Sequence, residues 1–227
     1  MSVIVITGTS RGIGLEMVKI LAEQGHKIYA LSRNSKPTQD LNHKNVFSYA
    51  YDMTDTDAAK KFASELQIRE EDQIDALVHN AGRFDQSSLA DYDLNRFKAV
   101  YEVNVFGVVA LTQALLPFMH SKTHVLSMSS MGGIQGSMKF AGLSAYSSSK
   151  AALVGLTELW AEEFKENGPR FNALALGAVQ TEMLEEAFPD YKAPLTAYEM
   201  AVYAAEFTLN GHHYYNGKCL QVSSSTP

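Results

Sequence analysis

The stretch that decides the fold is Thr7-Gly8-Thr9-Ser10-Arg11-Gly12-Ile13-Gly14, which follows the apolar run Val3-Ile4-Val5-Ile6. Four apolar residues before a glycine turn are typical of a strand buried on both faces. After the turn, apolar residues recur with the helical period from Ile13 to Leu21, and Gly25 predicts the end of that helix. The order strand, glycine turn, helix predicts a βα unit that binds phosphate.

Each glycine of this turn has a distinct task in such a unit. Gly8 permits the tight turn, Gly12 lets the backbone approach a pyrophosphate, and Gly14 lets the helix pack closely on the strand. The start of the helix adds free N–H groups and the positive end of its dipole, which both attract phosphate. The alternative is a glycine-rich turn that binds nothing.

Short apolar runs alternate with helical periods along the rest of the 227 residues, without repeats or a long linker. This alternation predicts right-handed βαβ units in one α/β domain over residues 1–227, a doubly wound Rossmann fold with a parallel sheet of about seven strands and helices on both faces. The expected strands are 3–6, 28–31, 46–51, 74–79, 125–128, 171–176 and 219–222. The expected later helices are 55–66 with Thr54 as N-cap, 94–119 with a break, 145–165 and 197–209.

Composition and charge exclude several classes of protein. The chain has Lys+Arg 19, Asp+Glu 25 and a formal charge of -6, which argues against an extended nucleic-acid surface. Its 46% hydrophobic content excludes a largely disordered chain. Cys219 alone cannot form an intrachain disulfide, so we expect a reducing compartment.

No membrane, targeting or metal segment is expected. The most apolar stretch, 103–119, is interrupted by polar residues and is shorter than the roughly 20 residues that spanning needs. The start of the chain lacks the basic flank of a signal peptide. The pair His212-His213 has no third ligand nearby, so no metal site is predicted. We expect a cytoplasmic protein with no membrane or nucleic-acid partner.

Tyr146 and Lys150 are four residues apart on a predicted helix, so both side chains project from one face. A free tyrosine has a pKa of about 10, too high for ready proton exchange at neutral pH. A nearby ammonium favours the phenolate and would lower that pKa. The pair therefore suits acid–base chemistry on a carbonyl or an alcohol, although an exposed helix pair without function has the same spacing.

Ser130 is expected at the carboxyl end of the fifth strand, the edge where doubly wound sheets bind ligands. Its hydroxyl would hydrogen-bond the oxygen of the substrate and stabilise charge that develops there. Ser129 is the competitor for this role, and a serine that only caps a turn is the structural alternative.

The end of the second strand indicates which dinucleotide is bound. An acidic residue there usually binds the adenosine ribose and repels a 2′-phosphate, but the sequence reads Leu31-Ser32-Arg33-Asn34. Arg33, together with Arg11 of the glycine turn, would hold that phosphate by charge-assisted hydrogen bonds. We therefore expect NADP(H) to be preferred over NAD(H), unless both arginines are only solvated surface charges.

The spacing Gly-x-x-x-Gly-x-Gly resembles that of the short-chain dehydrogenase/reductase family, and the other motifs of that family occur in order up to Thr181. His79-Asn80-Ala81-Gly82 looks like Asn-Asn-Ala-Gly, with His in the first place. Asn104 in Val-Asn-Val-Phe-Gly is similar to a helix asparagine of the family. The segments 129–133 and 146–150 match the active-site motifs, and 176–181 resembles Pro-Gly-x-x-x-Thr with Leu176 for the proline.

The resemblance implies hydride transfer between a bound nicotinamide and a small or medium carbonyl or alcohol substrate. Tyr146 would be the general acid and base, Ser130 would orient the substrate oxygen, and Lys150 would hold the nicotinamide ribose. Asn104 would hold a water through its backbone in a proton relay that ends at Lys150, although a core amide at a helix kink explains it as well. The cofactor-binding residues implied are Gly8, Ser10, Arg11, Gly12, Ile13, Gly14, Arg33, Asp52 at the adenine, Met53, Asn80, Ala81, Gly82, Tyr146, Lys150, Gly177, Val179 at the carboxamide and Thr181.

Three further expectations follow. Residues 181–196 leave room for only a small lid. The apolar faces of 105–119 and 154–164 exceed what one sheet face needs, and similar proteins often associate through the equivalent helices, so a homodimer or homotetramer is expected. The rival functions are a non-catalytic NADP(H)-binding sensor on the same fold and a methyltransferase, whose acidic residue after the second strand is missing here.

Overall fold

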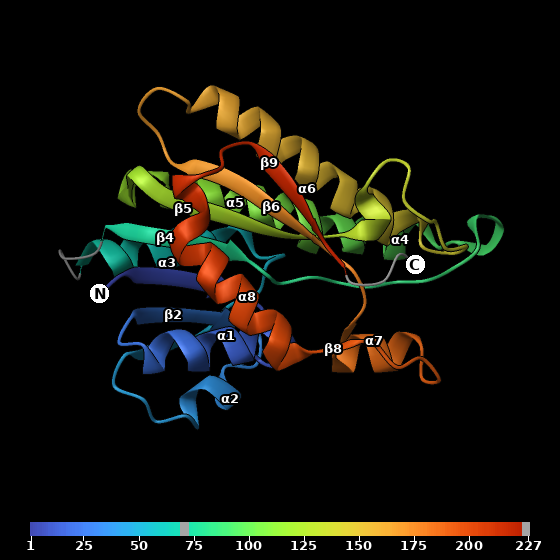
Figure 1. Cartoon of the computed structure of the whole chain (residues 1–227), viewed down its shortest axis with the longest axis horizontal. Helices are drawn as coiled ribbons and strands as arrows, with labels where there is room; N and C mark the ends of the chain where they lie inside the picture. Colours follow the sequence, from blue (N-terminus) through green and yellow to red (C-terminus); the bar gives the residue numbers. More distant parts are fainter. Residues whose placement is uncertain (69–72, 224–227) are drawn as a thin grey trace.

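A parallel sheet forms the centre of the protein, whose structure is a computed structural model that describes residues 1–68 and 73–223 (Figure 1). Seven strands lie in the order β3-β2-β1-β4-β5-β6-β9, and all neighbouring pairs are parallel. The strands are β1 Val3–Thr7, β2 Lys27–Ser32, β3 Val46–Ala50, β4 Ile74–His79, β5 Met119–Ser130, β6 Arg170–Leu176 and β9 Lys218–Val222. This confirms the predicted doubly wound α/β fold.

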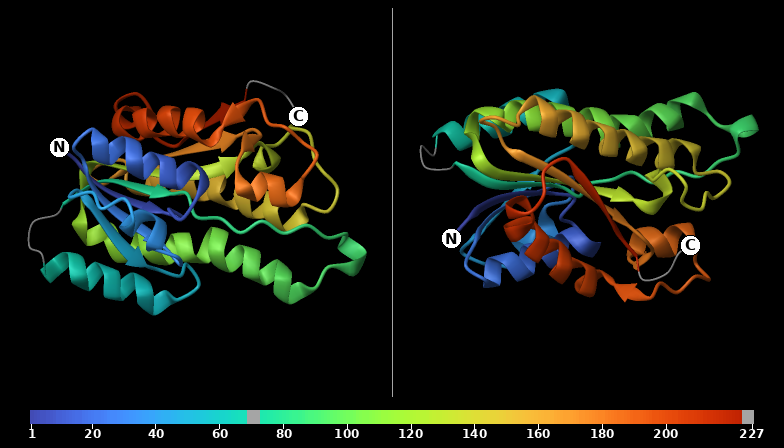
Figure 2. Two further views of the ribbon diagram at one scale, coloured as in Figure 1. Left: turned by 90° about the horizontal axis from the view of Figure 1, so that it is seen from below. Right: turned by 45° about the horizontal axis from the view of Figure 1, so that its top comes forward.

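Helices cover both faces of the sheet (Figure 2). On one face of the sheet, side chains of α1 and α8 form a hydrophobic core with the strands. On the other face, side chains of α3, α5 and α6 form a second core. The helices are α1 Gly12–Glu23, α2 Lys36–Gln39, α3 Thr56–Ile68, α4 Leu94–Tyr101, α5 Gly107–Leu115, α6 Ser144–Glu163, α7 Glu182–Ala187 and α8 Ala197–Asn210. The short strands β7 Val179–Gln180 and β8 Leu195–Thr196 pair with each other and flank α7.

The apolar start of the chain is explained by these two cores. On β1, Ile4 and Ile6 face the core under α1 and α8, whereas Val5 faces the opposite core. All three side chains are fully buried. A central parallel strand therefore needs apolar residues at every position rather than at every second one.

Two local expectations were wrong. The helix α3 is capped by Asp55, whose Oδ1 accepts from the backbone N–H of Asp57 (2.9 Å), and not by Thr54, whose hydroxyl donates to Asp52. The strand β5 begins at Met119, six residues before the predicted 125–128 strand, because its first residues pair with β4 through the backbone. Of those residues only Met119 is apolar, so no apolar run marks this part of the strand.

The predicted break in the helix 94–119 is a π-helical turn, Glu102–Phe106, between α4 and α5. By length and composition the helical stretch Leu94–Phe118 could cross a membrane, and so could many core helices. Here α5 buries Val108 and Leu111 against the sheet core, which is the packing of a core helix.

The topology brings the predicted motifs to one edge of the sheet. Strand order reverses at β1, which lies between β2 and β4, and ligands of doubly wound sheets bind at such a point, outside the carboxyl ends of the strands. The motif residues that follow β1, β2, β3, β4 and β6, or that end β5, therefore share this edge; they are Gly8, Arg33, Asp52, Asn80, Gly177 and Ser130.

Candidate active site

The glycine turn is locked to the loop after β4. Gly8 has φ +72°, and a Cβ there would lie 2.7 Å from Cα of Ala81. Nδ2 of Asn80 donates to the carbonyl oxygens of Thr7 and Gly8, both at 3.0 Å. A Cβ on Gly14 would collide with that same Asn80 amide and with the Gly8 carbonyl. Gly8, Gly14 and Asn80 thus form one closely packed unit.

The start of α1 is shaped to receive an anion. Arg11 occupies the N-cap position without a side-chain capping bond, so the first N–H groups of this 12-residue helix are not occupied by that side chain. Gly12 follows at φ +58°. The buried hydroxyl of Thr9 has no hydrogen-bond partner among the described residues. Free amides and an unpaired hydroxyl at a helix start fit the diphosphate of a dinucleotide; Ser10 and Ile13 flank them, half-buried.

Asp52 and Arg33 lie at the ends of neighbouring strands. Oδ1 of Asp52 accepts from both N–H and hydroxyl of Thr54, at 2.9 Å each. These bonds, the backbone one foremost, together with the charge of Arg33, hold the pKa of Asp52 below its usual value despite partial burial. Met53 is buried, and Gly107 packs against its carbonyl so closely that a Cβ would clash.

Arg11 points toward α7 in this structure. Its Nη2 donates to Oε2 of Glu186 at 3.1 Å, and its Nη1 pairs with Oε1 of the same carboxylate. This hydrogen bond raises the pKa of Arg11 and lowers that of Glu186. The predicted partnership of Arg11 and Arg33 at a 2′-phosphate stays a prediction.

Tyr146 and Lys150 are brought together one turn apart on α6. Nζ of Lys150 lies 5.8 Å from the centre of the Tyr146 ring and donates to the carbonyl of Met128 on β5 at 2.7 Å. Ser130, the last residue of β5, hydrogen-bonds the Tyr146 hydroxyl. Gly82 is adjacent, since a Cβ on it would lie 3.5 Å from the Lys150 ammonium.

The two serines of the β5 end have different partners. The hydroxyl of Ser129 is buried and donates to the backbone carbonyl of Lys150 at 2.8 Å. The hydroxyl of Ser130 faces Tyr146 and also accepts from the N–H of Gly132 at 3.2 Å. Of the two candidates, Ser130 is therefore the one beside the phenol, and Ser129 anchors α6 to the sheet.

The pKa of Tyr146 differs in direction from the expectation. Burial raises this pKa above its usual value, and the hydrogen bond with Ser130 only partly opposes the change. The ammonium of Lys150 is directed at Met128, and burial lowers the pKa of Lys150 itself to about 8. In the protein alone, desolvation of the phenolate therefore sets the direction of the shift in the Tyr146 pKa.

Asn104 lies in the π-helical turn and is fully buried. Its amide accepts from the N–H of Arg83 (2.7 Å) and donates to the Arg83 carbonyl and the Ser149 hydroxyl. The side chain thus joins the loop after β4 to α6, as a core amide at a helix kink would. The relay expected through its backbone stays a prediction, and π-helical turns are frequent at functional sites.

The loop after β6 brings the beginning of α7 to the glycine turn. Thr181 accepts from the N–H of Leu184 at 3.3 Å and so caps α7. Its methyl group lies 3.5 Å from where a Cβ on Gly12 would be. Val179 is buried, and Gly177 packs against Ser223 with no room for a Cβ.

Two residues of the candidate site, Phe84 and Glu186, lie outside the sequence motifs. The Phe84 ring lies 5.1 Å from that of Tyr146 and 6.1 Å from that of Phe188, which follows α7. The other is Glu186, the partner of Arg11. Both depend on contacts between distant segments, and no spacing in the sequence signals them.

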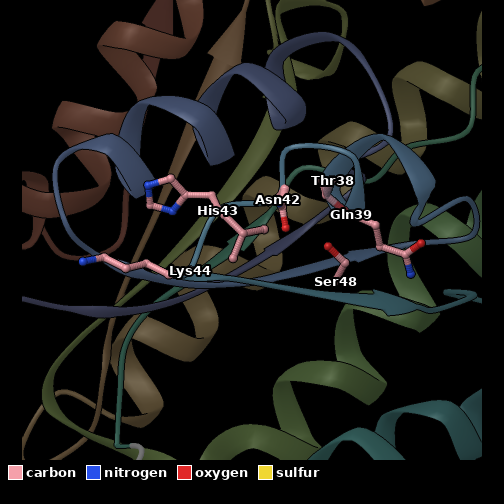
Figure 3. Close-up of a pocket in the computed structure, with 7 residues that line it drawn as sticks. Thr38, Gln39, Asn42, His43, Lys44 and Ser48 are labelled. Carbon is pink, nitrogen blue, oxygen red and sulfur yellow. The ribbon is translucent and has the colours of Figure 1, made fainter.

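Hollows on the described part of the protein lie beside the glycine turn and beside α2. One, of about 330 Å³, adjoins the glycine turn and is lined by Gly12, Leu15, Glu16, Gln180, Thr181, Glu182, Glu185 and Ala197. The other, of about 400 Å³, lies between the α2 segment and β3 (Figure 3). It is lined by Thr38, Gln39, Asn42, His43, Lys44, Val46 and Ser48, none of which is a predicted site residue.

Comparison with known proteins decides the family. The sequence profile of the short chain dehydrogenase family matches residues 2–192. The chain belongs to the short-chain dehydrogenase/reductase family. It is 32% identical, over 91% of its length and 76% of the relative's, to the probable short-chain type dehydrogenase/reductase VdlC of Helicobacter pylori. Membership makes the chain an NAD(P)-dependent oxidoreductase and removes the methyltransferase interpretation.

Solved structures of short-chain dehydrogenases share the whole fold. One from Brucella melitensis superposes with a TM-score of 0.89 at 19% identity, covering 100% of this chain and 96% of its own. A Burkholderia cenocepacia short chain dehydrogenase in complex with NADP superposes with a TM-score of 0.85 at 25% identity, covering 98% and 96%. Within the part of the chain that the structure describes, no cluster of His, Cys, Asp or Glu could hold a metal ion.

Proposed function

We propose that the protein is an NADP(H)-dependent reductase and dehydrogenase that interconverts a carbonyl and an alcohol with Tyr146 as general acid and base. The observation that carries the proposal is the contact of Ser130, Tyr146 and Lys150 at the sheet edge that also holds the glycine turn. A non-catalytic dinucleotide sensor has no need of these three side chains together.

The nicotinamide, when bound, supplies or accepts the hydride. The chain does the rest. The Tyr146 hydroxyl gives its proton to the substrate oxygen during reduction, and the Ser130 hydroxyl hydrogen-bonds the same oxygen. The raised pKa of Tyr146 keeps the phenol protonated, as a proton donor requires. Lys150, with its pKa of about 8, exchanges protons near neutral pH and passes one on to Tyr146, with the backbone of Asn104 holding a relay water.

Preference for NADP(H) rests on the end of β2. No carboxylate occurs in Leu31-Ser32-Arg33-Asn34, and Arg33 is exposed beside Asp52. A 2′-phosphate at this strand end meets the cation Arg33, and β2 itself ends without a carboxylate that would repel the phosphate. The ratio of the KM values for NADPH and NADH at matched substrate tests this preference, and equal values would reject it.

Aromatic side chains lie next to Tyr146, where the substrate carbonyl would bind. Phe84 covers Tyr146, and Phe188 of the 181–196 segment closes on Phe84. This supports a small or medium carbonyl compound with an apolar group next to the carbonyl, and a lid function for 181–196 in a chain that works as one domain. We further propose a cytoplasmic enzyme.

The decisive experiment is Tyr146→Phe. This variant is expected still to bind NADPH, because only the hydroxyl is removed, and to lose turnover by about 10²–10⁴-fold, the usual contribution of general acid catalysis. NADPH titration and the rate of NADPH consumption with a panel of ketones and aldehydes measure the two. An undiminished rate would mean that another group donates the proton.

A further inference from the structure

The glycine turn and α7 are joined by a two-point ion pair across 175 residues of chain. Both terminal nitrogens of Arg11 are engaged by the one carboxylate of Glu186, with the Nη2–Oε2 distance at 3.1 Å. The arginine side chain is 46% exposed and the glutamate 64%, so the pair lies at the mouth of the site and within reach of a ligand.

A second carboxylate from α7 stands at the same turn. Oε2 of Glu182 would lie 3.5 Å from a Cβ on Gly12. The preceding residue, Thr181, caps α7 and touches the same point, which fixes the first turn of the helix there. The charge of Glu182 also acts on Arg11. One short helix thus places two acids against the positive residue of the phosphate turn.

This arrangement bears on the cofactor, and the inference rests on the proposed function. A guanidinium presents its donors in one planar fork that suits a carboxylate and a phosphate equally. A 2′-phosphate that binds Arg11 must displace Glu186 or accept its repulsion. We propose that Glu186 is a specificity-determining residue, which competes with the 2′-phosphate for Arg11 and so weakens binding of NADP(H) relative to NAD(H).

The size of the effect follows from the exposure of the pair. Exposed ion pairs contribute modestly, so removing the competitor is expected to change affinity by about two- to fivefold. NADH has no 2′-phosphate and does not need Arg11 in this way. The ratio of the two dissociation constants therefore isolates the competition from any general effect of α7 on binding.

The test is equilibrium titration of NADPH and NADH, followed by protein fluorescence without substrate. Glu186→Gln is expected to raise the preference for NADPH about two- to fivefold. The control is Asp190→Asn, which removes the same charge just after α7 and is expected to leave the ratio unchanged. In an Arg11→Gln background, Glu186→Gln is expected to have no effect on the ratio, because the group competed for is gone.

The outcomes separate the two proposals. If the wild type binds NADPH and NADH but Glu186→Gln behaves like Asp190→Asn, the competition is overturned and the proposed function stands. The same holds if Glu186→Gln acts equally with and without Arg11. If the wild type binds neither dinucleotide, the proposed function falls and this inference falls with it.

Discussion

His79 takes the place of an asparagine in the family motif and has become a structural residue. Its Nε2 lies 2.8 Å from the hydroxyl of Thr112, which itself donates to the carbonyl of Val108. Because the Thr112 hydroxyl donates its hydrogen to Val108, it can only accept from His79. Nε2 of the neutral imidazole must therefore carry the hydrogen. Burial agrees, since it lowers the pKa of His79 to about 3.

Thr112→Val is therefore expected to destabilise the protein by about 1–3 kcal/mol, because it leaves a buried imidazole N–H without an acceptor. Thr157→Val is the matched control: Thr157 is also buried and donates to a helix carbonyl, that of Leu153. Urea unfolding of the two variants measures the difference. Equal losses of stability would mean that the bond to His79 contributes nothing beyond the helix bond.

Phe84 is expected to select the substrate. Phe84→Ala removes an aromatic contact worth about 0.5–1.5 kcal/mol, so kcat/KM for an aryl ketone should fall up to about tenfold more than for a small aliphatic one. Phe84→Leu keeps an apolar side chain, so its kcat/KM for the aryl ketone should lie between those of the wild type and of Phe84→Ala. Steady-state kinetics with paired ketones test this. A uniform loss for both substrates would show that Phe84 only supports Tyr146.

At the scale of single residues, the sequence predicts the features that backbone conformation determines. Gly8 and Gly12 have positive φ angles, and the four-residue spacing of Tyr146 and Lys150 places both beside Ser130. It does not predict the direction of the Tyr146 pKa, because the density of packing around a side chain is a property of the whole fold. The contacts of Glu186 and Phe84 are hidden for the same reason.

At the scale of elements, the hydrogen bonds of one buried histidine, His124, connect β5 with β6 and α8. Nδ1 of His124 donates to the carbonyl of Thr208 at 3.0 Å, and Nε2 accepts from the Asn172 amide at 3.1 Å. Only the neutral ring can make both bonds. Burial lowers the pKa of His124 to about 4, below its ordinary value of 6.5.

This shift predicts an acid-sensitive fold. Since the unfolded chain takes up the proton first, the stability from His124 is complete above about pH 6.5 and is lost as the pH falls toward 4. His124→Gln should remove about 1–3 kcal/mol from the loss of unfolding free energy between pH 7 and pH 4.5. Parallel urea titrations of the wild type and the variant decide, and an equal dependence of stability on pH in the two proteins would contradict the assignment.

Apolar periodicity predicts the elements well wherever burial forms them and poorly where hydrogen bonds do. The strand β1 and the helix break at Asn104 lie where expected. The first half of β5 is not predicted from apolar periodicity. Its polar residues are held by backbone pairing with β4 and by the Thr123 hydroxyl, which accepts from the N–H of His120. The cap of α3 is Asp55 rather than Thr54, a choice between two neighbouring residues that both favour the position.

At the scale of the whole molecule, the layer of α3, α5 and α6 exposes apolar side chains that its own sheet does not use. Leu159 on α6 is 66% exposed and Phe106 before α5 is 53% exposed. Exposed large apolar side chains on adjoining helices favour an interface between copies of the chain. We expect a homodimer or a homotetramer built through this layer (Figure 2).

Leu159→Lys tests the interface, because a lysine at its centre would bury an unpaired charge. Light scattering of the wild type should give a multiple of the 25.0 kDa chain, and of the variant a smaller assembly. Gln24→Lys, which adds the same charge at an exposed position just after α1, should leave the mass unchanged. A wild type of 25.0 kDa would refute assembly altogether, whereas a variant of wild-type mass would move the interface away from α6.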